Sequence, residues 1–147
     1  MKHETDELNN SEIVGQLRSG KLLVVNRNKR NGLIIQKPYH SEFAGPGSAV
    51  GGILDLDCQK AIPVGNFSLV VPDSYEARQT AYKTRRQWIM LTKQITDKPE
   101  PLERAERLLT QFEAFFEVQT VADLPDDALA PLVGVLPQTI TLARQRN

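Results

Sequence analysis

The sequence predicts an α+β protein, with a small N-terminal antiparallel β subdomain, a long connecting helix and a group of C-terminal helices. Short runs rich in Val, Ile and Leu lie between Gly, Pro and Asn residues over positions 21–72, a pattern typical of strands. Apolar residues then recur at helical spacing to the end of the chain, which indicates helices. We therefore expect three regions, 1–72, 73–98 and 99–147.

The composition is that of an ordinary globular protein. The 147 residues are 40% hydrophobic and 24% charged, and no apolar run approaches a membrane span. The N-terminal residues are polar and acidic, unlike a signal peptide. Cys58 is the single cysteine, which excludes a disulfide framework and favours a cytoplasmic location without membrane contact.

The first half predicts a short helix followed by four strands. Residues 1–10 are expected to fray, and Ser11 begins a short helix to Leu17. The predicted strands are Lys21–Asn26, Gly32–Lys37, Val50–Leu56 and Phe67–Val71. The polar connection that ends in Asn31-Gly32 predicts that the first two strands form a hairpin.

Residues 74–96 predict one long helix with an apolar stripe. Two rows of seven-residue spacing make the stripe: Tyr75, Tyr82 and Ile89, and Ala81, Trp88 and Ile95. Such a stripe is typical of a short coiled coil, and it equally suits packing on the chain's own sheet. Both arrangements remain open, and we expect a homodimer through residues 75–95.

Basic and aromatic residues alternate along the same helix. The basic residues are Arg78, Lys83, Arg85 and Arg86, and the aromatic residues among them are Tyr82 and Trp88. This combination can contact nucleic acid. The favoured interpretation is that the basic side chains extend past a packed aromatic stripe into solvent.

The C-terminal region predicts three packed helices. An amphipathic helix runs from Pro101 to about Val118 and would support the two helices of residues 126–145. Gly134 lies where the chain must turn, a position that often needs a positive φ. Pro137 suits the first turn of the last helix, and Pro131 should kink the preceding one. Leu129, Leu132, Val133, Ile140 and Ala143 are expected to face inward.

This spacing resembles the bacterial helix-turn-helix, and within that class the C-terminal module of the Crp/Fnr family of transcriptional regulators. The matching elements are Leu129-Ala130, Val133-Gly134 and Thr139-Ile140. Fainter similarities lie at Val50–Ile53 and Val70–Tyr75. The resemblance implies a bacterial transcription regulator that binds DNA as a dimer.

The chain departs from that family at several positions. Gly52 stands where the family has a glutamate for the ribose, so cyclic-nucleotide binding is not expected. Pro137 and Leu142 stand where the family usually carries base-reading arginine. From Pro101 onward seven acidic residues oppose four arginines.

Two functions follow from these observations. In the first, a regulator contacts DNA bases through Gln138, Thr139 and Thr141 and phosphates through Arg144 and Arg146. In the alternative, the same acidic helices form a non-enzymatic protein-interaction module.

No other constellation predicts chemistry. His3, His40 and Cys58 lack metal-site spacing, so neither a metal nor a cofactor is expected. Gly45–Gly52 is interpreted as a turn-rich connection. Asp55 and Asp57 are interpreted as the exposed side of an edge strand. No nucleophile has an evident base, so we do not expect an enzyme.

Overall fold

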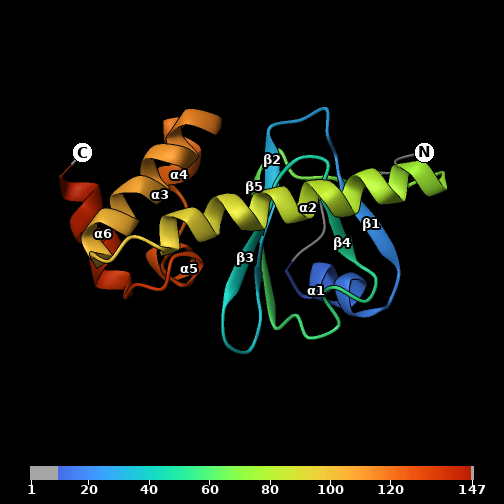
Figure 1. The fold of residues 1–147 in the computed structure, drawn as a ribbon, viewed down its shortest axis with the longest axis horizontal. Helices are drawn as coiled ribbons and strands as arrows, with labels where there is room; N and C mark the ends of the chain where they lie inside the picture. The colour runs from blue at the N-terminus through green and yellow to red at the C-terminus, as the bar shows by residue number, and fades with distance from the viewer. Residues whose placement is uncertain (1–9, 147) are drawn as a thin grey trace. The chain divides into compact units, whose positions relative to one another are not determined.

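The computed structural model of the chain describes residues 10–146 and confirms the α+β class (Figure 1). The chain divides into two compact units, one ending at Ile89 and one beginning at Met90. The fraying expected at the N-terminus falls on residues outside the described range, apart from Asn10, which begins helix α1. Among the described residues, no helix is both long and apolar enough to cross a membrane.

The first unit contains two antiparallel sheets of three strands. One sheet has the order β4 (Ala49–Gly51), β1 (Leu22–Val25), β6 (Leu69–Val70). The other has the order β3 (Ser41–Ala44), β2 (Asn31–Gln36), β5 (Lys60–Gly65). The predicted hairpin is therefore wrong, because β1 and β2 belong to different sheets and each pairs with other strands.

The remaining strand predictions hold in part. The strand expected over Val50–Leu56 ends at Gly51, and the chain turns there instead of continuing. Strands β3 and β5 have no counterpart in the prediction. Pro63 lies inside β5, where a missing N–H is tolerated because β5 is at the edge of its sheet.

Helix α1 (Asn10–Arg18) covers the core of the first unit. Its residues Ile13 and Leu17 are fully buried and pack in one cluster with Val25, Leu33 and Leu69. Burying a side chain of this size stabilises a fold by about 1.5–3 kcal/mol. The short helix predicted from Ser11 is thus an integral part of the core.

The long helix α2 (Tyr75–Thr96) is confirmed, and its first part packs on the sheets. Ala81 is buried against β1 and β4. Trp88 meets Phe43 edge-on, with ring centroids 5.4 Å apart and an interplanar angle of 83°. A Cβ atom at Gly45 would lie 2.2 Å from the Trp88 ring, so only glycine permits this approach. In the row of the stripe that contains them, Ala81 and Trp88 therefore cover the chain's own sheets.

The other row of the stripe, formed by Tyr75, Tyr82 and Ile89, is less covered in the single chain. Tyr75 is 64% exposed, whereas Tyr82 and Ile89 are half-buried. The homodimer through residues 75–95 stays a prediction.

The second unit contains the C-terminal helices. They are α3 (Pro101–Phe115), α4 (Val118–Ala122), α5 (Asp126–Leu129), the 3₁₀ turn η1 (Ala130–Leu132) and α6 (Pro137–Gln145). Helix α6 packs on α3 and α5. The expectation of three helices is too simple, because α3 ends at Phe115 and a separate helix α4 begins at Val118. At Pro131 the α-helix has already given way to the 3₁₀ turn, in agreement with the expected disruption.

Candidate functional site

The turn before α6 has the geometry that the sequence predicts. Gly134 has a φ of 68°, and a Cβ atom there would meet no atom within 4 Å. Glycine is therefore favoured by the backbone conformation alone. Pro137 is the first residue of α6, and Ile140 and Ala143 are fully buried.

The five residues predicted to contact DNA all lie on or directly after α6, and their surroundings differ. Gln138, Thr141 and Arg146 are exposed, whereas Thr139 and Arg144 are partly buried. Thr141 donates a hydrogen bond from its hydroxyl to the Asp126 carboxylate. Gln138 and Thr141 are three positions apart and therefore share one face of the helix.

Arg144 is bonded to atoms of its own unit through all three guanidinium nitrogens. Its Nε donates to Asp126 Oδ1 at 2.7 Å. Its two Nη atoms donate to the backbone oxygens of Leu124 at 2.7 Å and Val121 at 3.2 Å. Burial acts to raise the pKa of Asp126, but the hydrogen bonds from Thr141 and Arg144 outweigh it and lower that pKa. Arg144 thus ties α6 to the ends of α4 and α5.

Two other arginines of the second unit also make internal contacts. Arg146 forms an ion pair with Glu106 at 3.2 Å, and both side chains are partly exposed. Arg104 on α3 donates to the backbone oxygens of Val133 at 2.9 Å and Gly134 at 3.2 Å. The sequence gives no sign of these two contacts, because Val133 and Gly134 are 29 and 30 positions away from Arg104.

Apolar side chains are exposed beside these polar residues. Leu136, which precedes α6, is 68% exposed, and Leu142 is 47% exposed. Leu142 lies four positions after Gln138 and next to Thr141, on the outer side of the helix. The outer surface of α6 is therefore mixed, with uncharged polar and aliphatic groups.

The first unit holds a buried ionic cluster, and two sequence interpretations need correction there. Asp55 is fully buried, not exposed on an edge strand, because the chain turns inward after β4. Arg85 is 2% exposed and does not extend into solvent. Its two Nη atoms donate to Asp55 at 3.0 and 2.9 Å, to Glu42 at 2.7 Å and to the Ala49 backbone oxygen at 3.0 Å.

The cluster continues from Asp55 and Glu42 towards the surface. Lys37 Nζ lies 3.3 Å from Asp55 and 3.2 Å from the exposed Asp57. His40 Nε2 lies 2.7 Å from Glu42. Burial acts to raise the pKa of Asp55, but hydrogen bonds and charge from Arg85 overcome this and lower that pKa. The cluster joins β2, β3, the turn after β4 and α2.

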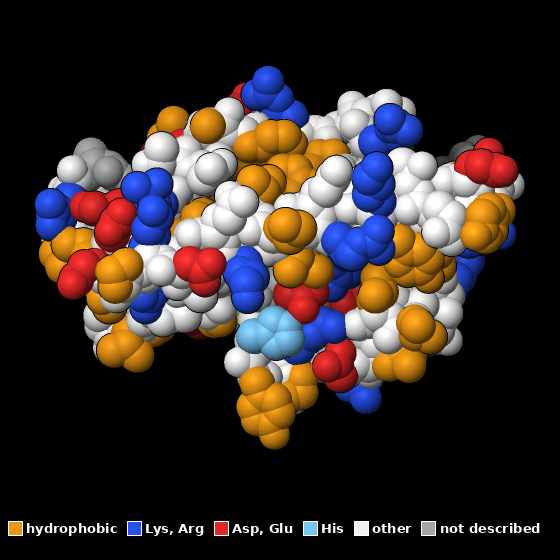
Figure 2. Space-filling view, in the orientation of Figure 1, with side chains coloured by type: hydrophobic (Ala, Val, Ile, Leu, Met, Phe, Trp, Pro, Cys, Tyr) orange, Lys and Arg blue, Asp and Glu red, His pale blue; other side chains and the backbone are white. Residues whose placement is uncertain are grey.

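The other basic residues of α2 are exposed, namely Arg78, Lys83, Arg86 and Lys93. Figure 2 shows basic side chains over α2, whereas basic and acidic side chains are interspersed over the C-terminal helices. No single large area of one sign covers α6 in this view.

Metal ligation has no geometric support within residues 10–146. No three His, Cys, Asp or Glu side chains in that range are placed to hold a metal ion. His3 lies outside the described residues. Cys58 is buried, and burial together with the Asp55 charge raises the pKa of its thiol to about 11.

No family model, curated protein or solved structure matches the chain. The similarity to Crp/Fnr regulators therefore rests on the sequence motif.

Proposed function

We propose that the protein is a non-enzymatic binding module and that the outer surface of α6 contacts another protein. The hydrogen bonds that Arg144 makes within its own unit are the main support for this proposal. Its guanidinium already satisfies the Asp126 carboxylate and two backbone oxygens, and hydrogen bonds to charged groups contribute about 1.5–3 kcal/mol each. Turning Arg144 towards a DNA phosphate would forfeit those bonds.

The charge of the second unit supports the same proposal. Seven acidic residues and four arginines lie between Pro101 and the C-terminus. DNA presents about one negative charge per 1.7 Å of helix axis, so binding it depends on uncompensated basic groups. Because Arg144 and Arg146 are paired with carboxylates, few such groups remain near α6.

The exposed side chains on α6 suit a protein partner. Leu136 and Leu142 provide aliphatic contact area, and Gln138 and Thr141 provide hydrogen-bonding groups between them. Protein interfaces commonly combine an apolar centre depleted of charge with a polar rim.

A DNA-binding regulator, without cyclic-nucleotide binding, is the second candidate. The turn at Gly134, the position of Pro137 and the exposure of Gln138 favour it. A dimer through α2 would then present two copies of α6 to adjacent turns of the major groove.

Site-specific photo-crosslinking in the natural host tests the first proposal. A photoreactive residue at Leu142 should crosslink to a defined protein, whereas the same residue at Leu91, an equally exposed leucine of α2, should not. Equal crosslinking at both positions would count against a partner on α6.

Selection of random-sequence duplex DNA at low salt tests the second candidate. We expect no enriched sequence. Enrichment that is lost in Gln138→Ala and falls steeply with salt would support DNA binding and overturn the protein-binding proposal.

A further inference from the structure

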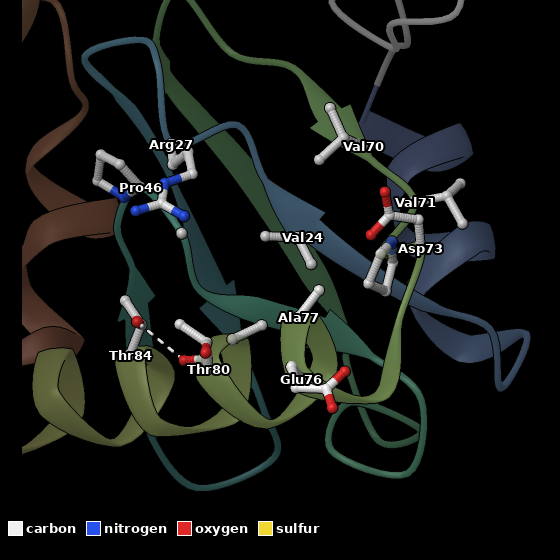
Figure 3. Close-up of a pocket in the computed structure, with 13 residues that line it drawn as sticks. Val24, Arg27, Pro46, Val70, Val71, Asp73, Glu76, Ala77, Thr80 and Thr84 are labelled. Carbon is white, nitrogen blue, oxygen red and sulfur yellow. Dashed lines mark hydrogen bonds between the residues drawn. The ribbon is translucent and has the colours of Figure 1, made fainter.

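A groove of about 580 Å³ lies in the first unit, between the first half of α2 and the sheet that contains β1 and β6 (Figure 3). It belongs to the unit that ends at Ile89. None of its lining residues belongs to α6, and nothing in its interpretation depends on the function proposed for α6.

Small side chains on α2 leave this space open. Ala77, Thr80 and Thr84 face it at helical spacing, while Val24 of β1 forms part of its floor. Val24 is only 9% exposed, so the floor of the groove is apolar and closely packed. None of the short helix side chains can fill the distance to the sheet.

The rim of the groove is apolar and open to solvent. Val70 and Val71 follow one another along the edge of the sheet and are 39% and 61% exposed. Pro46 lines the other side. Exposed aliphatic groups beside an apolar floor are typical of a surface that another molecule covers. The open rim suits an extended chain better than an enclosed small molecule.

Charges of opposite sign lie at the two ends. Arg27 is at the end near Pro46, and Asp73 and Glu76 are at the opposite end (Figure 3). None of the three forms an ion pair with another residue of the range 10–146. The groove thus separates charges that are not paired within residues 10–146, in contrast to the buried cluster around Arg85.

We propose that this groove binds a short extended peptide segment of a partner protein. The segment carries an acidic side chain at the Arg27 end and a lysine or arginine at the end of Asp73 and Glu76. Small aliphatic residues between these two charges occupy the space over Val24 and Ala77. This order of charges complements the groove, and apolar contact supplies the affinity while the charges set the direction of the chain.

A displayed library of random eight-residue peptides, selected on the full chain, tests the proposal. We expect enrichment of peptides with an acidic residue, an aliphatic stretch and a basic residue in that spatial order. Arg27→Glu should change the preference at the acidic position to a basic residue. It should also weaken binding of the peptide selected on the unmodified chain by about 5- to 10-fold, because the reversal both removes a modest exposed ion pair and places two like charges together. Arg30→Glu is the matched control, because Arg30 is an exposed arginine of the same loop that does not line the groove.

Filling the groove gives an independent measurement. Ala77→Leu should reduce affinity for the selected peptide at least 10-fold in fluorescence anisotropy, whereas Gln79→Leu on the outer side of α2 should not. If Ala77→Leu fails to fold, Thr80→Phe replaces it, because Thr80 is exposed. No enrichment, a preference unchanged by Arg27→Glu, or full binding by the filled variants would each overturn the proposal. So would self-association of the chain that the filled variants abolish, since a second copy would then be the occupant.

Discussion

Replacing Arg85 by methionine should destabilise the first unit through loss of a single guanidinium. Methionine keeps much of the aliphatic length and removes the four hydrogen bonds that Arg85 makes to Asp55, Glu42 and the Ala49 backbone. Removing one partner of a buried ion pair typically costs about 3–5 kcal/mol, because the remaining charge is left uncompensated. Here the Lys37 ammonium stays 3.3 Å from Asp55, so we expect the lower end, about 3 kcal/mol.

Urea unfolding followed by tryptophan fluorescence measures the stability of the first unit, which contains Arg85. Trp88 is the only tryptophan in the chain and packs on Phe43 within the first unit. With a urea dependence of about 1–3 kcal/mol per molar, a loss of about 3 kcal/mol lowers the midpoint by roughly 1–3 M. Arg86→Met is the control, because Arg86 is exposed on the next position of α2 and should change stability by less than about 0.5 kcal/mol.

The same variant should show a defined pH dependence. Burial acts to raise the pKa of Asp55 and of Glu42. For Asp55, the contacts with Arg85 outweigh the effect of burial and lower the folded-state pKa. For Glu42, the hydrogen bond with His40 and then the contacts with Arg85 outweigh the effect of burial and lower the folded-state pKa. A lowered folded-state pKa contributes stability above the unfolded-state values of about 3.9 and 4.3, and this contribution is lost as the pH falls through the folded-state pKa. The difference between the unmodified chain and Arg85→Met should therefore be full at pH 7 and shrink below about pH 4. Equal midpoints for Arg85→Met and Arg86→Met at pH 7, or a difference that persists undiminished at pH 2, would refute the reasoning.

Three further changes have expected outcomes. Gly134→Ala should cost about 1 kcal/mol, because the site has space for a Cβ but a φ of 68°; an unchanged calorimetric melting temperature would contradict this. Gly45→Ala should lower the free energy of unfolding by about 1–3 kcal/mol through overpacking. It should also shift the Trp88 emission, because the new Cβ would lie 2.2 Å from the ring. An emission spectrum like that of the unmodified chain would contradict the packing of Trp88 on Gly45. The Cys58 thiol, buried and with a pKa raised to about 11, should not react with an aromatic disulfide reagent at pH 8 until the protein unfolds, and rapid reaction of the folded chain would show that the site opens.

Helical periodicity predicts the second half of the chain well because a helix repeats its buried positions every three to four residues, so the period can be read directly from the sequence. The long helix expected over 74–96 is observed at Tyr75–Thr96. The buried positions Ile140 and Ala143 and the turn at Gly134 are also as expected. Helix α4 is missed because it is five residues long, too short to show a period.

The sequence does not predict the strand pairing correctly, because Asn31-Gly32 does not form a hairpin turn in the fold. The Asn31 side chain donates to the backbone oxygens of Asn26 and Lys29, and so closes the connection between two sheets. Gly32 is required because the Phe43 ring would lie 2.3 Å from a Cβ atom there. Both residues also suit a tight turn, and only the tertiary contacts distinguish the two roles.

The ion pairs within the chain are the contacts that the sequence predicts least well. Lys37, Glu42, Asp55 and Arg85 come from four segments, and each is an ordinary surface residue when taken alone. The fold brings them together out of solvent, and it likewise pairs Arg144 with Asp126 across 18 positions. These charges are already compensated within the chain, whereas Arg27 and the carboxylates facing its groove have no such partner in the range 10–146. A net charge of zero therefore says little about binding, because the groups free to recognise another molecule are those that remain after the internal pairs are removed.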